Sequence, residues 1–127
     1  MAQTTFQQLA AERYVSLVTF RRNGNGVATP IWVAADGGNL YAVTDGTSAK
    51  MKRLKVSGRV RLAACDARGN VSGEWVEGHA RRVDDLAVVA RASAALARKY
   101  GWQFALLNVF SRLFGRIGRR AFIEITL

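Results

Sequence analysis

A dense group of cationic side chains between residues 50 and 61 has the chemistry of an anion-binding site. The group contains six basic residues and no acid: Lys50, Lys52, Arg53, Lys55, Arg59 and Arg61. Hydroxyl side chains precede it, at Thr44, Thr47 and Ser48. If residues 48–56 form a helix, its N-terminus can offer backbone amides together with Lys50 and Arg53 to a phosphate group. A basic helix that only faces water explains the same residues, because charge runs usually lie in solvent.

A proline interrupts the next unusual stretch, "VATPIWV" at residues 27–33. Proline cannot donate to a strand ladder, so Pro30 predicts a sheet edge, a bulge or a break in pairing. Trp32 follows two positions later and is typical either of a core side chain or of a platform for a ligand. The residue types alone leave both interpretations of Trp32 open.

Candidate catalytic side chains are few in this sequence. His79 is the only histidine, and Glu77 on the same strand face could orient it, but no serine or cysteine nucleophile accompanies the pair. Cys65 is the only cysteine, which excludes an intramolecular disulfide and a cysteine-based metal site. We therefore identify no catalytic residue and no metal ligand from the residue types.

The charge balance points to an anionic partner. Nineteen Lys and Arg residues against nine Asp and Glu give a formal net charge of +10, which suits nucleic acid, a lipid surface or a phosphorylated ligand. Nucleic acid is not favoured, because no aromatic residue interleaves with the basic residues from 44 to 61 that stacking would require.

Membrane contact has one candidate segment, residues 102–120. It combines bulky apolar side chains with four arginines: Arg112, Arg116, Arg119 and Arg120. The same pattern suits a membrane-surface helix, or a helix that closes a barrel or covers a dimer seam. The sequence has no recognisable secretion signal and no apolar run of about 18 residues, so we expect a cytoplasmic protein without membrane insertion.

The elements that must position these residues are mostly short strands. Runs rich in β-branched and aromatic residues predict strands at 14–20, 27–35, 40–44, 59–65, 73–83 and 121–127. The turns "NGNG" and "DGGN" join the first three into an antiparallel meander. With 127 residues, half of them hydrophobic, the chain is expected to form one domain over residues 1–127. Six such strands with peripheral helices are typical of a barrel or sandwich.

Helical spacing predicts which side chains the helices bury. Met51 and Leu54 are expected to hold the basic helix to the core. A second helix is expected at 86–100, after Asp84 and Asp85 and before Gly101. The helical period places five of its residues roughly on one face: Leu86, Val89, Ser93, Leu96 and Tyr100. It continues at 102–120 with Trp102, Leu106, Phe110, Leu113 and Ile117 at helical spacing.

Four segments, taken in order, resemble one family of redox proteins. They are "LVTFRRNGNGVATPIWV", "LYAVTDGTSAKMKRLK", "RVRLAACDARG" and "WVEGHARRV", with "KYGW" after them at residues 99–102. Over residues 12–127 the chain is similar to the split β-barrel flavin and deazaflavin oxidoreductases, the superfamily of pyridoxamine 5'-phosphate oxidase, and most of all to the PPOX class F420-dependent enzymes. The C-terminal region that grips substrate phosphate in the oxidases is not recognisable, which argues against that substrate.

The resemblance implies a mainly β protein, a six-stranded antiparallel split barrel of the FMN-binding type, that forms a homodimer with cofactors at the subunit interface. It implies that the phosphate tail of coenzyme F420, or alternatively of FMN or FAD, lies beside Thr44, Ser48, Lys50, Lys52 and Arg53. It implies that the ring lies along Thr29, Pro30, Ile31 and Trp32, with Trp75 of the partner subunit closing the groove. The cofactor would exchange hydride with an unsaturated small-molecule substrate. The alternatives outside enzymes are a carrier that holds a cofactor without turnover and a protein that binds nucleic acid.

Overall fold

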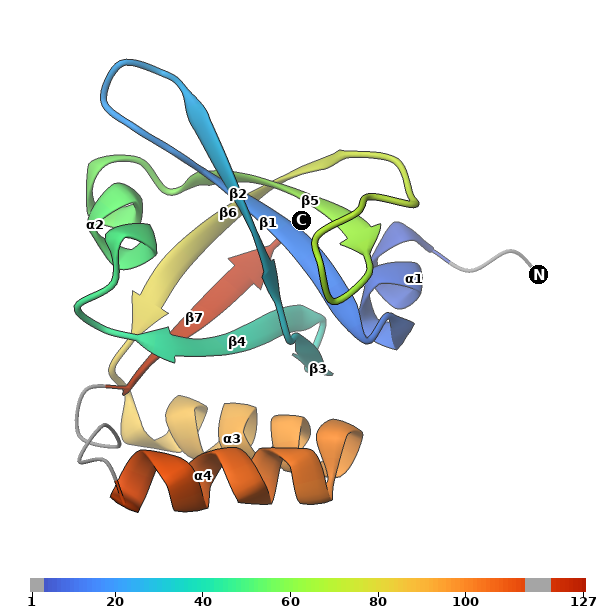
Figure 1. Ribbon diagram of the computed structural model, residues 1–127, viewed down its shortest axis with the longest axis vertical. Helices are drawn as coiled ribbons and strands as arrows, with labels where there is room; N and C mark the ends of the chain where they lie inside the picture. The colour runs from blue at the N-terminus through green and yellow to red at the C-terminus, as the bar shows by residue number, and fades with distance from the viewer. Residues whose placement is uncertain (1–3, 114–119) are drawn as a thin grey trace.

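One antiparallel sheet forms the centre of the protein, and helices pack around it (Figure 1). The structure, a computed structural model, describes residues 4–113 and 120–127, and within these residues the sheet has seven strands. Along the chain the elements are α1 (Thr5–Ala11), β1 (Tyr14–Phe20), β2 (Gly26–Ile31), β3 (Ala34–Asp36), β4 (Asn39–Asp45), α2 (Ala49–Val56), β5 (Arg59–Cys65), β6 (Val76–Val83), α3 (Leu86–Tyr100), α4 (Trp102–Leu113) and β7 (Arg120–Thr126).

The strand order is β2-β1-β5-β6-β7-β4-β3, so the sheet is open and its two edges are β2 and β3. The expected six-stranded barrel is therefore wrong in strand number and in closure, because the strand predicted at 27–35 divides at Trp32 and Val33. The Cα atoms of Ile31 and Ala34 are three peptide units apart and so at most about 11 Å apart. The sheet must therefore curl until its edges approach each other, without pairing there.

The β1–β2 hairpin confirms the strand and turn signals of the sequence. Val15 pairs with Ile31 at one end and Phe20 with Gly26 at the other. Because β2 is an edge strand, Pro30 can stand opposite Ser16 without removing a hydrogen bond from an interior ladder. The predicted edge position of Pro30 is thus confirmed.

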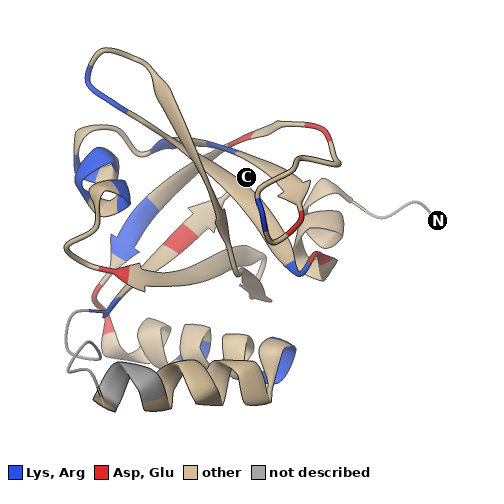
Figure 2. Ribbon diagram, in the orientation of Figure 1, with Lys and Arg blue, Asp and Glu red and all other residues tan. Residues whose placement is uncertain are grey.

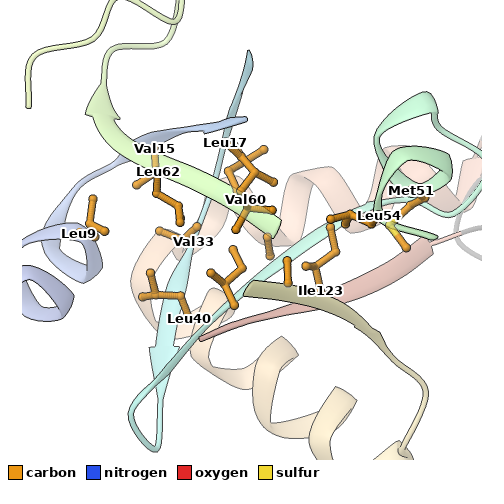
Figure 3. Packing of buried hydrophobic residues seen from close by; sticks show 14 of the residues in the cluster. Leu9, Val15, Leu17, Val33, Leu40, Met51, Leu54, Val60, Leu62 and Ile123 are labelled. Carbon is orange, nitrogen blue, oxygen red and sulfur yellow. The ribbon is translucent and has the colours of Figure 1, made fainter. Parts of the chain in front are cut away.

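The main core lies on the inner face of the curled sheet (Figure 3). Alternation along the strands turns side chains such as Leu17 and Leu62, which are opposite each other in β1 and β5, into this core. A second cluster lies between the other face of the sheet and α3: Ala34, Tyr41, Ala92, Ala95, Leu96, Tyr100, Phe104 and Phe122. The sheet therefore separates two apolar layers.

Helix α2 forms where the sequence predicts it. Ser48 is its N-cap, and its hydroxyl accepts the Met51 N–H at 3.4 Å. Met51 and Leu54 are buried, with exposed fractions of 2% and 8%, and join the main core, as expected. The basic helix is thus tied to the sheet by two apolar side chains. Helix α1 was not predicted, although Thr4 and Gln7 form a reciprocal capping box at its start.

Helices α3 and α4 show that a correct helical period does not settle which face is buried. Asp85 caps α3 and Gly101 ends it, as predicted, and Leu96 and Tyr100 are buried. Leu86, however, is 84% exposed, and the inward face is completed by alanines instead.

The apolar positions that helical spacing aligns on α4 face solvent in this chain where the structure describes them. Trp102 is 73% exposed and Leu113 is 71% exposed, whereas Phe104 is buried. The predicted position of Ile117 and the side chain of Phe110 lie outside the described residues. Among the helices that the structure describes, none is both long and apolar enough to cross a membrane.

Candidate cofactor site

Arg53 is held in place by the neighbouring strand β1. Its Nε donates to the Thr19 hydroxyl at 2.6 Å, and Thr19 is completely buried. Burial, followed by the nearby charge of Arg21, lowers the pKa of Arg53 from its ordinary value. The guanidinium is therefore fixed between α2 and the sheet, close to another cation.

Lys50 lies three positions earlier on the same side of α2 and is partly buried. Burial lowers the pKa of Lys50, and the neighbouring Arg53 charge lowers it further. We call Ser48, Lys50 and Arg53 the α2 anchor. Its two cations repel each other, and an anion bound between them would remove that repulsion and stabilise both charged forms.

The wider surroundings of the α2 anchor are also basic. Figure 2 shows Lys and Arg on α2, at the tip of the β1–β2 hairpin and on β6, on one flank of the molecule. Lys52 is exposed on α2, while Thr44 lies in the last part of β4, opposite Ala121 of β7. The structure thus brings Lys50 and Arg53 together, with Ser48 as the N-cap of the same helix, and leaves Lys52 towards solvent.

Thr29 supplies a buried polar atom on the strand next to Thr19. Thr19 pairs with Val27, so Thr29, two residues further along β2, lies diagonally across on the same inner face. The Thr29 hydroxyl oxygen is buried and has no hydrogen-bond partner among the described residues. Such an atom costs about 1–3 kcal/mol unless a ligand or water pairs with it. Together with the crowded cations, it fits a site that takes a phosphate-bearing polar ligand.

The residues expected along the cofactor ring do not share one face. Strand alternation turns Ile31 inward, where it is buried, and leaves Pro30 exposed on the outer face. Trp32 lies beyond the end of β2, where its ring stacks on Tyr100 with centroids 4.4 Å apart. Trp75 is 39% exposed, and the Arg61 guanidinium lies 5.7 Å from its ring centre.

Two hollows of the surface lie away from the α2 anchor. The larger, about 440 Å³, lies between α1 and the segment before β6. The other, about 330 Å³, is apolar and includes Trp32. Neither of them includes a residue of the α2 anchor.

Sequence reasoning missed the roles of three side chains that organise this region: Thr19, Arg21 and Tyr100. Thr19 could have been found, because it continues the inward row of Val15 and Leu17 with a hydroxyl. The structure does not show the suggested contact between Glu77 and His79. The Glu77 carboxylate instead forms ion pairs, 3.0 Å from Arg59 and 3.4 Å from Arg61. His79 is exposed.

Residues 1–127 match the family described as pyridoxamine 5'-phosphate oxidase. The chain belongs to this family. The resemblance read from the sequence is therefore confirmed at the level of the family, whereas membership in its F420-dependent branch stays a prediction. A search of curated proteins found no significant match.

Solved structures with the same fold differ in what their names say they do. A conserved hypothetical protein from Mycobacterium tuberculosis has a TM-score of 0.70 and 18% identity over 98% of this chain and 80% of its own. The heme storage protein HutZ from Vibrio cholerae has a TM-score of 0.69 and 12% identity over 95% and 84%. An F420 reductase has a TM-score of 0.59 and 16% identity over 98% and 94%. At these identities the likeness shows that the chains have the same fold and nothing more.

Proposed function

We propose that this protein is a homodimeric oxidoreductase that binds coenzyme F420 and transfers hydride between it and an unsaturated small molecule. The observation that carries the proposal is the α2 anchor, where Lys50 and Arg53 are partly buried and each has its pKa lowered by burial and a neighbouring cation. A bound phosphate would offset this repulsion. F420 carries such a phosphate together with a carboxylate tail.

The chain's own residues have binding and orienting roles in this proposal. Ser48, Lys50 and Arg53 would hold the phosphate, with Thr44 beside them and Lys52 reaching the more distant tail. The segment 29–32 and Trp75 of the partner subunit would confine the ring and exclude water. The cofactor itself supplies the hydride chemistry. No side chain is assigned as a catalytic acid or base.

Two alternatives keep the same anchor and differ in what it holds. FMN or FAD would use the same phosphate contacts with a flavin ring. A non-catalytic cofactor carrier is favoured by one observation, the same fold in a protein named for heme storage.

The decisive experiment is a titration of the purified protein with F420, FMN and FAD, followed by cofactor fluorescence. F420 is expected to bind most tightly. Lys50→Ala should weaken that binding by about 1–3 kcal/mol, the scale of a charge-assisted hydrogen bond. Lys55→Ala is the matched control, because Lys55 is an exposed cation on the same helix. Equal losses in the two variants would show that only overall charge matters and would defeat the site.

Turnover separates an enzyme from a carrier. Reduced F420 mixed with a panel of unsaturated acceptors should be oxidised faster with the protein than without it. Binding without turnover across the panel would favour the carrier. Nucleic acid binding, the remaining use of the +10 charge, would instead weaken steeply with salt, by about 0.9 in log affinity per phosphate contact for each tenfold rise in salt.

A further inference from the structure

The chain crosses between the two edges of the sheet at Trp32 and Val33. β2 ends at Ile31 and β3 begins at Ala34, and these strands lie at opposite ends of the strand order. Val33 is completely buried, so its backbone N–H and C=O need partners although it belongs to neither strand. The position of the crossing depends on what supplies those partners.

Tyr100, at the end of α3, supplies the first of them. The Val33 N–H donates to the Tyr100 hydroxyl at 3.0 Å. The same hydroxyl lies 3.0 Å from the Val33 carbonyl oxygen and 2.9 Å from the Arg13 carbonyl oxygen. Its single proton can be donated to either of these two oxygens. One side chain thus ties the crossing to the start of β1.

Lys99 supplies the second partner. Its ammonium donates to the Val33 carbonyl at 2.5 Å and to the Glu12 carbonyl at 2.6 Å. Glu12 and Arg13 form the link between α1 and β1. Two consecutive residues of α3 therefore join the crossing and this link to the helical layer. We call Lys99 and Tyr100 the seam clamp.

The seam clamp also orients Trp32. The Trp32 and Tyr100 rings are nearly parallel, at 8°, with centroids 4.4 Å apart. Because Trp32 directly follows the last residue of β2, the contact fixes the direction in which that strand leaves the sheet. A substitution at Tyr100 would therefore shift the positions of Ile31 and Thr29.

We propose that Lys99 and Tyr100 are positioning residues of the proposed cofactor site: by holding the Val33 backbone they fix the end of β2 against which the ring lies. This inference rests on the proposed function, since it assigns the seam clamp to the ring half of that site. The α2 anchor would hold the tail, and the seam clamp would act only on the ring.

The test separates ring from tail by using two probes, F420 and its chromophore without the phosphate tail. Tyr100→Phe keeps the stacked ring and removes the hydroxyl. It should weaken binding of both probes about tenfold, the scale of one hydrogen bond. Lys50→Ala should weaken binding of F420 and leave the chromophore unchanged. Tyr41→Phe is the matched control, because Tyr41 is also buried in the second cluster and donates to Glu124; it should change either affinity by no more than about twofold.

Hydrogen exchange at the Val33 amide reports the clamp without any ligand. This amide should exchange about tenfold faster in Tyr100→Phe than in the unchanged protein or in Tyr41→Phe. Lys99→Met serves as a second variant if Tyr100→Phe does not fold, and it should weaken both probes as well. If the unchanged protein binds neither probe, the proposed function fails and the inference fails with it. If it binds both and Tyr100→Phe binds them equally well with a faster Val33 amide, only the inference is overturned.

Discussion

The α2 anchor and the seam clamp both present lysine at a helix of this chain, yet they use it in opposite ways. Lys99 gives two hydrogen bonds to backbone carbonyls, of Glu12 and Val33. Burial lowers the pKa of Lys50, and the charge of the neighbouring cation Arg53 lowers it further. Two donors of Lys99 are thus already used within the chain, whereas the charge of Lys50 would gain from an anion, and the neighbours that shift its pKa among the described residues include none. The comparison distinguishes a structural cation from a binding cation.

Loss of the seam-clamp ring should have the largest effect on stability. Tyr100→Leu removes a stacked aromatic ring and leaves the buried Val33 N–H without its partner. The free energy of unfolding should fall by about 3–5 kcal/mol, measured by urea denaturation. Leu113→Ala, a truncation on the exposed side of α4, is the control and should change it little. A loss of stability no larger than that of the control would contradict the structural role of the seam clamp.

Alanine variants at the two cations of the α2 anchor should differ in their free energy of unfolding. Arg53→Ala leaves the buried Thr19 hydroxyl without the guanidinium, and should lower the free energy of unfolding by about 1–3 kcal/mol. Lys50→Ala removes a cation that repels Arg53 and should cause no loss of stability. Both variants should bind F420 more weakly. If Lys50→Ala were as destabilising as Arg53→Ala, Lys50 would be a structural cation like Lys99.

The seam clamp should make stability depend on pH in two opposite steps. Burial is the main cause that lowers the pKa of Lys99 from 10.5 to about 8. The charge of Glu12 opposes this shift, and the charge of Arg13 adds to it. Between these values the unfolded chain binds a proton that the folded chain does not, so stability should rise with pH, by about 1 kcal/mol after allowance for solvent screening.

The second step belongs to Tyr100. Burial raises the pKa of its hydroxyl from 10.0 to about 12, while Arg13 opposes this rise and Tyr14 adds to it. Between these values the folded chain keeps a proton that the unfolded chain loses, so stability should fall as pH rises. Urea midpoints from pH 7 to 11.5 measure both steps. In Lys99→Met the rise above pH 8 should shrink to the part that Lys50 contributes, because burial lowers the pKa of Lys50 as well, while the later fall remains. An unchanged rise would assign it to another group.

The smallest effect should come from the cap of α2. Ser48→Ala removes a hydroxyl that accepts a rather long hydrogen bond, 3.4 Å from the Met51 nitrogen. The expected loss of stability is about 0.5 kcal/mol, the low end for an N-cap. A larger loss of F420 affinity than of stability, measured by titration and denaturation of the same variant, would support direct contact of Ser48 with the phosphate.

Local signals of the sequence were enough for the elements that carry the α2 anchor. The hairpin around "NGNG" and the helix after Ser48 each depend on neighbouring residues, and both formed where predicted. Met51 and Leu54 were placed in the core by spacing alone.

The seam clamp could not be predicted in the same way. Pro30 indicated an interruption, but nothing local indicates that the two halves of "VATPIWVAA" go to opposite edges of the sheet. That outcome depends on partners distant in sequence, above all on Tyr100, which contacts Val33 across 67 positions. The exposed side of α4 was left open for a related reason: periodicity identifies an apolar face and does not show what covers it.

The crossing at Val33 bears on how long the folded state lasts. Both hairpins that flank it, β1–β2 and β3–β4, close over a few residues and can form early, whereas the contact with Tyr100 needs α3 in place. Interactions made after the transition state govern the rate of unfolding rather than the rate of folding. Tyr100→Phe should therefore shorten the lifetime of the native protein while leaving its folding rate nearly unchanged, as stopped-flow measurement of both rates can check.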